Sequence, residues 1–472
     1  MRFTSNDKSV KENSLHVTLQ NRFGLLMLAW PIFLDQFLKV VLVNVDTLML
    51  SGYSDQAVAA VGVSSQIILV TTFIYGCIGI GSQIMIAQLV GAKNMKRIQD
   101  VISAALCLAT WFGLVLSLVF LFASKWMLSL LGSSGTFLDY AQTFLVGVGS
   151  ITLFVCLQST IVAILRSYGY VKYAVLVPII INLLNLFGNY LLIYGNLGFP
   201  KLGVTGVVIS TTVSNVIGFV LAIILLKQLL GYRLRCKELL FGKKQEMKNI
   251  LNIGIPSSGE TFSYNASMLL VTVMVTFLGE TELTTKIYVQ NITQFVTLFS
   301  ISIGGATQIL IGFLIGAGDQ TAAYKRAFKN LRIGLVFTAV SSTLLFLLSD
   351  PLMRLFTENQ SIITLSKSIF LLTIILEIVR TINIIIIGSL NAALDVRFPV
   401  YVAIVVMWFI SIPLTYFFGL HTSLGLKGIW LGLIADEGIR SALMLYRWSS
   451  GVWKRKSLVH VSPKNLSEID RG

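Results

Sequence analysis

The chain has 472 residues, is 55% hydrophobic and has a mean hydropathy of +0.82, while only 12% of its residues are charged. This composition excludes an ordinary soluble domain and indicates a protein embedded in a lipid bilayer. The net charge of +15 would suit a nucleic-acid partner, but the positions of the charges argue against one.

Long apolar runs recur along nearly the whole sequence. A helix needs about 20 apolar residues to span a bilayer, and the alternating segments of about ten residues that are typical of a transmembrane barrel are not visible. The sequence therefore predicts an all-α integral membrane protein with twelve transmembrane helices. The predicted spans are 25–50, 61–90, 101–123, 144–165, 173–194, 204–230, 250–278, 288–315, 333–348, 369–390, 400–418 and 428–446.

The two halves of the sequence resemble each other. At a shift of 225 residues, Pro31 and Asp35 align with Pro256 and Glu260. Six helices per half is an even number, so both halves enter the membrane from the same side, which predicts two parallel-repeat six-helix bundles. The predicted divisions are an N-terminal tail at 1–22, bundles at 23–230 and 250–449, a basic linker at 231–249 and a C-terminal tail at 450–472.

Lysine and arginine lie mainly on one predicted side of the membrane. The tails and the loops after the second, fourth, sixth, eighth and tenth helices hold 27 of the 36 Lys and Arg residues. Positive charge is retained on the cytoplasmic side, so both termini are predicted to be cytoplasmic. We interpret the basic linker as a solvated connector that lies on an anionic leaflet.

Charged residues inside the predicted helices carry the functional hypothesis, because such residues usually line a cavity or an ion path. Asp35, Lys39 and Asp46 fall within about 40° on one face of the first helix. Asp35 and Lys39 are predicted to pair as i,i+4 neighbours, and Asp46 is predicted to be unpaired. The alternative is that the pair is structural and that Asp46 is a helix-end acid near the outer interface.

The second half holds four acids but only two bases within its helices. They form either an internal salt-bridge network or a site with spare negative charge for a proton, Na⁺ or a cationic substrate. We predict that the two arginines contact acids of this group. The residues are Glu260, Glu377, Arg380, Asp436, Glu437 and Arg440.

Other kinds of chemistry are not supported by the sequence. There is no phosphate-binding loop that would indicate ATP as the energy source, and no His or Cys constellation that would indicate an enzyme or a metal centre. Paired charges within the membrane favour a two-state carrier over an open channel. We expect no cofactor.

Four motifs resemble the multidrug and toxic compound extrusion (MATE) family, in particular its bacterial, NorM-like members in the broad sense. They cover residues 30–31, 45–49 (VDTLM), 81–92 and 185–206, and the resemblance extends over about residues 20 to 450. It implies two six-helix bundles in a V shape. It also implies drug export by antiport with H⁺ or Na⁺.

The resemblance also implies roles for particular residues. The family's first-helix acid corresponds to Asp46, and its fifth-helix pair corresponds to Asn185 and Asn189, where Asn189 replaces an Asp of some relatives. Those amides are either ion or substrate ligands or packing contacts between helices. Glu260 and Glu377 are the candidates for a Na⁺ site in the second bundle.

We therefore expect a monomeric antiporter in a bacterial plasma membrane that exports cationic or amphipathic small molecules. The alternative is a flippase for lipid-linked sugars or lipids from the same superfamily. Twelve helices and an excess of acids inside the membrane favour the antiporter.

Overall fold

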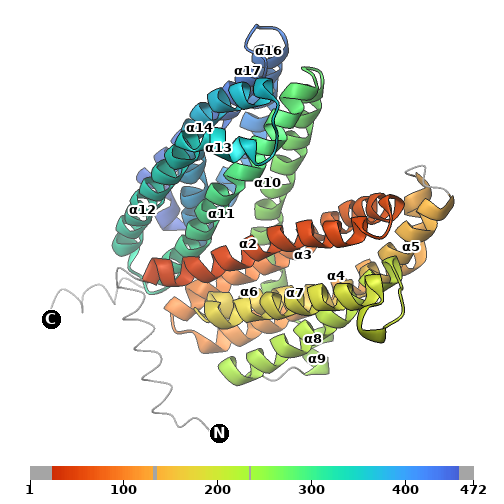
Figure 1. Ribbon diagram of the computed structural model, residues 1–472. Helices are drawn as coiled ribbons and strands as arrows, with labels where there is room; N and C mark the ends of the chain where they lie inside the picture. Colours follow the sequence, from red (N-terminus) through yellow and green to blue (C-terminus); the bar gives the residue numbers. More distant parts are fainter. Residues whose placement is uncertain (1–23, 131–134, 233–234, 457–472) are drawn as a thin grey trace. The chain divides into compact units, whose positions relative to one another are not determined.

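The computed structural model describes residues 24–130, 135–232 and 235–456, and every element in these ranges is helical (Figure 1). The first half and the linker contain α2 (Gly24–Ser51), α3 (Asp55–Gly91), α4 (Met95–Leu130), α5 (Gly135–Ser150), α6 (Thr152–Ser167), α7 (Val171–Tyr194), η1 (Asn196–Gly198), α8 (Val204–Leu230) and α9 (Cys236–Leu240). The second half contains α10 (Lys244–Thr276), α11 (Glu280–Gly316), α12 (Gln320–Leu347), α13 (Ser349–Arg354), α14 (Gln360–Ala392), α15 (Arg397–Val406), η2 (Met407–Ser411), α16 (Ile412–Leu420), α17 (Leu426–Ser449) and η3 (Val452–Arg455).

The prediction of twelve spans is confirmed. Among the described residues, nine helices are long and apolar enough to cross a membrane, with α15 to α16 counted as one, and the bent pair α5 and α6 forms a tenth span. Helices α10 and α17 complete the set, with 33 and 24 residues. These two contain several of the internal charges, which lower their mean hydropathy.

The fourth predicted span differs from the structure. An uninterrupted helix was predicted for residues 144–165, but α5 and α6 meet at an angle of 48° around Ile151. Gly149 packs so closely on Phe120 that a Cβ would lie 2.6 Å from the ring. Glycine and serine beside each other, here Gly149 and Ser150, are a common cause of helix kinks.

The internal repeat is confirmed by the ends of the helices. Helices α3 and α11 have 37 residues each, and both ends of α11 lie 225 residues after those of α3. Near the end of each half the shift becomes 222, and Gly203 and Gly425 have almost the same backbone conformation, with φ of 55° and 53°. Both glycines precede a long helix at a positive φ that other residues rarely adopt.

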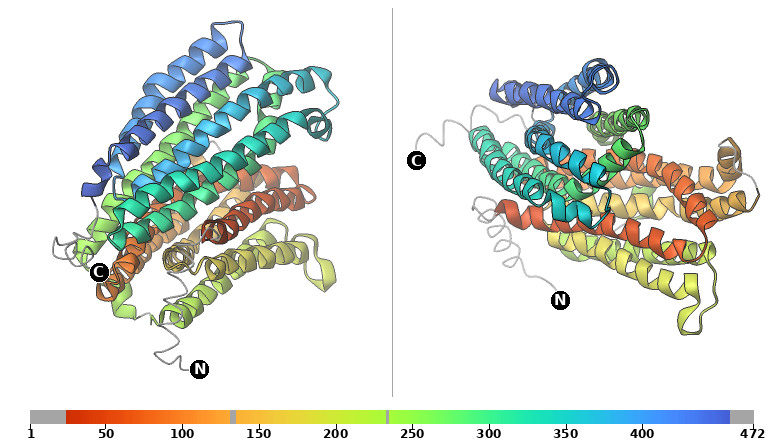
Figure 2. Two further views of the ribbon diagram at one scale, coloured as in Figure 1. Left: turned by 90° about the vertical axis from the view of Figure 1, so that its left-hand side faces the viewer. Right: turned by 45° about the horizontal axis from the view of Figure 1, so that its top comes forward.

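The chain divides into two compact units, and three of the four boundaries fall inside α2, α3 and α10, while the fourth lies between α3 and α4. The C-terminal unit comprises Met1–Phe33, Ala87–Lys93 and Gly259–Gly472, and the N-terminal unit comprises Leu34–Ile86 and Asn94–Ser258. In the C-terminal unit, α14 packs beside α11, α12 and α17 (Figures 1 and 2). In the N-terminal unit, α4 packs against α5, α6 and α9, and α7 packs against α8.

The described part of the basic linker is folded onto α4. The Trp111 indole donates to the carbonyl of Leu240 at 3.2 Å, and Lys243 forms an ion pair of 2.6 Å with Asp100. The described linker thus makes specific contacts with α4 while most of its side chains stay exposed, and its interpretation as a connector on an anionic leaflet stays a prediction.

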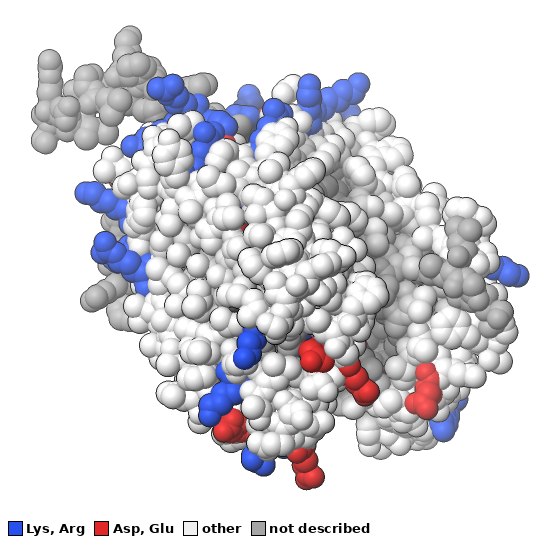
Figure 3. Space-filling model, turned by 90° about the horizontal axis from the view of Figure 1, so that it is seen from above, with Lys and Arg blue, Asp and Glu red and all other residues white. Residues whose placement is uncertain are grey.

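Large apolar side chains remain exposed on the membrane-spanning helices, as lipid contact requires. Phe122 and Trp126 on α4 are examples. In Figure 3, uncharged atoms cover most of the face in view, and the visible charged side chains gather toward its margins. Such a surface is suited to hydrocarbon in its middle and to water or headgroups at its edges.

Candidate functional site

An ion-pair cluster lies inside the N-terminal unit. Asp35 on α2 is only 1% exposed, and its Oδ2 atom accepts hydrogen bonds from Lys39 at 3.0 Å and from Arg166 on α6 at 2.6 Å. The Lys39 side chain is 53% exposed, whereas that of Arg166 is 19% exposed. The predicted Asp35–Lys39 pair is confirmed, and Arg166 is a second, more buried partner.

A separate polar chain surrounds the second acid of α2. The Asn189 amide donates to Asp46 at 2.9 Å and to the Oδ1 atom of Asn185 at 3.2 Å. The Asn185 amide in turn donates to Thr211 on α8 at 3.0 Å. Asp46 has no salt bridge to any Lys or Arg in the described ranges, which confirms the prediction that it is unpaired.

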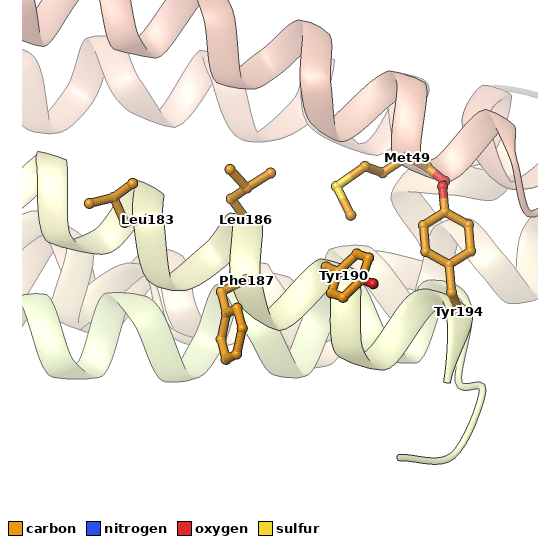
Figure 4. Close-up of a pocket in the computed structure, with 6 residues that line it drawn as sticks. All are labelled: Met49, Leu183, Leu186, Phe187, Tyr190 and Tyr194. Atoms are coloured by element: carbon orange, nitrogen blue, oxygen red, sulfur yellow. The ribbon is translucent and has the colours of Figure 1, made fainter. Parts of the chain in front are cut away.

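An apolar cavity of about 570 Å³ lies between α2 and α7 (Figure 4). At 100° per residue, most of its α7 residues lie on a different face of that helix from Asn185 and Asn189. Asp46 is not among the residues that line the cavity, although Met49 lies only one turn beyond Asp46. The lining residues are Met49, Leu183, Leu186, Phe187, Tyr190 and Tyr194.

The C-terminal unit contains a denser network on α14 and α17. Arg380 pairs with Glu377 on its own helix, and its Nε lies 3.5 Å from Glu437 on α17. Thr297 on α11 donates to the other oxygen of Glu377 at 3.0 Å. Both oxygens of the Glu377 carboxylate thus accept a hydrogen bond, and the charge of Arg380 beside them would oppose a Na⁺ ion shared with Glu260.

Arg440 completes this network from α17. It lies 2.6 Å from Asp436 and 3.0 Å from Glu437, and the Asn383 amide donates to Glu437 at 2.8 Å. All four side chains are nearly fully buried. The prediction that both arginines contact acids of this group is confirmed.

Glu260 differs from the other acids of the C-terminal unit. It is partly buried on α10, and the charges of Arg440 and Glu437 on α17 act on it. No hydrogen bond or salt bridge joins Glu260 to another described residue. Glu260 and Asp46 are therefore the two predicted site acids that lack a directly bound base.

Sequence reasoning missed Arg166, which it assigned to a loop. Arg166 lies 131 residues from Asp35 in the chain, and its counterpart in the second half is Asn391. Neither local spacing nor the repeat could indicate the contact.

Among the residues that the structure describes, no group of three or more His, Cys, Asp and Glu is arranged to hold a metal ion.

Known proteins resemble this chain over most of its length. The family model described as MatE matches residues 31–191 and 256–417. The uncharacterized transporter YisQ of Bacillus subtilis is 41% identical over 448 residues, which cover 95% of this chain and 98% of the relative. The probable multidrug resistance protein NorM of Thermotoga maritima is 26% identical and covers 93% of this chain and 94% of the relative.

Solved structures share the fold. A crystal structure of MATE in the bent conformation superposes with a TM-score of 0.84 at 18% identity, covering 94% of this chain and 99% of that one. A superfamily transporter from Pyrococcus furiosus, described as having a binding pocket of reverse polarity, superposes with a TM-score of 0.81 at 17% identity, covering 92% of this chain and 96% of that one.

Proposed function

Since the chain belongs to the MatE family, whose members are membrane transporters and not enzymes, we propose that it exports small cationic or amphipathic molecules in exchange for H⁺ or Na⁺. The names of several relatives, which are described as probable multidrug resistance proteins, support this substrate class. Transporters of this family need no cofactor, and the energy would come from the ion gradient alone.

The observation that carries the proposal is the contrast between paired and unpaired acids. Asp35, Glu377, Asp436 and Glu437 each contact an internal Lys or Arg. Asp46 accepts only an amide hydrogen bond from another described residue, and Glu260 has no direct partner among them. Because an unpaired carboxylate in a membrane-embedded site is costly, each must be neutralised by a proton, a metal cation or a cationic substrate.

Exchange follows from competition for such a carboxylate. A cationic substrate and the coupling ion that bind the same acid exclude each other. If each favours a different one of two conformations, the inward movement of the ion drives the outward movement of the substrate. Asp46 would be the exchange residue of the N-terminal unit, with Asn189 and Asn185 as ligands or positioning groups. Glu260 would be the exchange residue of the C-terminal unit.

The distribution of positive charge supports a location in a bacterial plasma membrane with both termini in the cytoplasm, because Lys and Arg gather on one set of connections. We further propose that the protein acts as a monomer, with the lipid bilayer and the transported molecule as its partners.

A flippase for lipid-linked sugars or lipids remains the second candidate. One observation favours it: the half-exposed ammonium group of Lys39 lies beside Arg166, so this part of the N-terminal unit carries more positive than negative charge. An anionic headgroup would bind there more readily than a cation.

Efflux from everted membrane vesicles tests both candidates. A fluorescent cation is added, and a proton gradient and a Na⁺ gradient are imposed separately. We expect Asp46→Asn and Glu260→Gln each to abolish gradient-driven transport while protein remains in the membrane, because an amide keeps the shape but cannot exchange a proton near neutral pH. Asp139→Asn, at an exposed acid of α5, is the matched control and should transport normally.

Two outcomes would contradict this mechanism. Transport at the parental rate by both Asp46→Asn and Glu260→Gln would place coupling elsewhere, in Glu377 or in the Asp436 and Glu437 pair. Absence of cation transport under either gradient, together with scrambling of a fluorescent anionic lipid in proteoliposomes, would replace the antiporter by the flippase.

A further inference from the structure

The linker between the two halves carries an apolar patch that the transport cycle does not explain. Phe241 is 73% exposed and Leu240 is 47% exposed, and the Trp111 ring beside them is 48% exposed. The hydrogen bond from the Trp111 indole to the Leu240 carbonyl holds the end of α9 against α4 at this point. Three large apolar side chains are thus gathered on one surface outside the candidate sites.

This patch continues the lipid-facing surface of α4. Leu114, Val115, Leu118 and Phe122 are exposed and recur every three or four residues from Trp111, so all five lie on one face of the helix. The linker runs along α4 from Asp100, which binds Lys243, to Trp111, a distance of about 16 Å at the rise of an α-helix. It therefore follows the spanning helix instead of projecting away from it.

Positive side chains lie on both sides of Leu240 and Phe241 in the sequence. Arg235, Lys237, Lys244 and Lys248 are exposed, and no salt bridge links them to another described residue. The acids of the same segment are engaged, since Glu246 pairs with Arg97 at 2.8 Å and Glu238 accepts a hydrogen bond from Tyr232 at 2.6 Å. The accessible charge of the linker is therefore strongly positive.

We propose that the linker, residues 235–248, is an interfacial binding site for anionic phospholipid on the side of the membrane where the basic loops lie. Leu240 and Phe241 insert among the acyl chains beside Trp111, and the free Lys and Arg side chains bind the phosphate groups of the lipids. This pairing of an apolar face with a basic rim is the arrangement by which interfacial segments bind anionic membranes. A soluble protein partner would not account for the continuity with the lipid-facing stripe of α4.

Native mass spectrometry of the purified full-length protein tests the basic rim. The protein in detergent is titrated separately with phosphatidylglycerol and phosphatidylcholine. Each Lys near an anionic surface is worth about a fivefold change in binding. The variant Lys237→Gln/Lys244→Gln/Lys248→Gln removes three such charges and should lose on the order of 100-fold in phosphatidylglycerol affinity if the effects add, at least about fivefold if one Lys dominates, and little in phosphatidylcholine affinity.

The matched control removes three exposed charges elsewhere, as Lys125→Gln/Arg354→Gln/Lys427→Gln. It should bind phosphatidylglycerol as the parent does. An equal loss in both triple variants would show a general effect of net charge and would overturn the proposal. Equal binding of the two lipids by the parent protein would overturn it as well.

Electron paramagnetic resonance tests the apolar part. A spin label is attached at position 241 (Phe241→Cys) with Cys236 replaced by Ser, and Cys77, Cys107 and Cys156 are buried. In liposomes that contain phosphatidylglycerol, the label should be more accessible to oxygen, which concentrates in lipid, than to a water-soluble nickel chelate. Greater accessibility to the chelate would place the side chain in water and refute membrane insertion.

Discussion

Replacement of Arg166 by Met should destabilise the protein far more than replacement of Lys39 by Met, although both residues bind the same oxygen of Asp35. Arg166 lies 2.6 Å from the Asp35 oxygen, whereas Lys39 lies 3.0 Å from it. The Arg166 side chain is 19% exposed and the Lys39 side chain is 53% exposed. Water competes with the Lys39 ammonium group for its interactions, whereas the guanidinium of Arg166 is largely shielded. Asp35 itself is almost completely buried.

The expected magnitudes follow from this difference in burial. Removal of the buried partner leaves a largely uncompensated charge and should cost about 3–5 kcal/mol. Removal of Lys39 should cost about 0–1 kcal/mol, because its ammonium group is half exposed and Arg166 still neutralises Asp35. The double variant Asp35→Asn/Arg166→Met should recover most of the loss, because neither charge then remains buried alone.

The assay is equilibrium unfolding in mixed micelles of dodecyl maltoside and sodium dodecyl sulfate, followed by circular dichroism. Arg354→Met, at an exposed arginine of α13, is the control and should change the free energy of unfolding by less than about 0.5 kcal/mol. The reasoning fails if Lys39→Met costs as much as Arg166→Met. It also fails if Asp35→Asn/Arg166→Met is as unstable as Arg166→Met or less stable.

Two further predictions concern packing in the C-terminal unit. Asp395→Asn should loosen η3, because the fully buried Asp395 carboxylate binds Arg447 at 2.7 Å and Lys456 at 2.6 Å. Limited trypsin digestion should then cleave η3 faster in the variant than in the parent protein. An unchanged cleavage rate would disprove the role of this contact. Gly316→Ala should cost about 1–3 kcal/mol by overpacking, because a Cβ there would overlap a backbone carbonyl of α3. Gly438→Ala, where a Cβ meets nothing within 4 Å, should leave the thermal midpoint unchanged or raise it slightly, because alanine favours a helix over glycine; an equal loss of stability in the two variants would contradict the argument.

The helices were predictable because the bilayer imposes a minimum apolar length on every span, and the repeat indicated that both halves contain the same number of spans. The bend between α5 and α6 was not predictable in the same way. The neighbouring Gly149 and Ser150 permit a kink but do not require one. The close contact that accompanies the kink joins Gly149 to Phe120 on α4, and local sequence does not indicate a contact between two helices. The continuous helix α14 occupies the corresponding place in the second half.

The contacts of the candidate site were predictable only within single helices. Asp35 with Lys39, and Glu377 with Arg380, are three or four residues apart, so helical geometry alone brings them together. Arg166 reaches Asp35 from another helix, and nothing in the spacing of the sequence indicates this contact. The functional roles of Asp46 and Glu260 stay predictions until transport is measured.

The pairing pattern limits which acids can serve an exchange cycle. An acid that binds and releases a cation in every cycle and also holds a guanidinium must break that ion pair each time, which leaves two buried charges uncompensated and raises the cost of the cycle. Glu377 and Glu437 are bound to arginines within the C-terminal unit, so their contacts suit the fixing of α14 against α17. Asp46 and Glu260 are free of this constraint. If both acids take part in the cycle, Asp46→Asn and Glu260→Gln should each abolish coupled transport although the other acid is intact. If a single acid is sufficient, only one of the two variants should lose coupled transport.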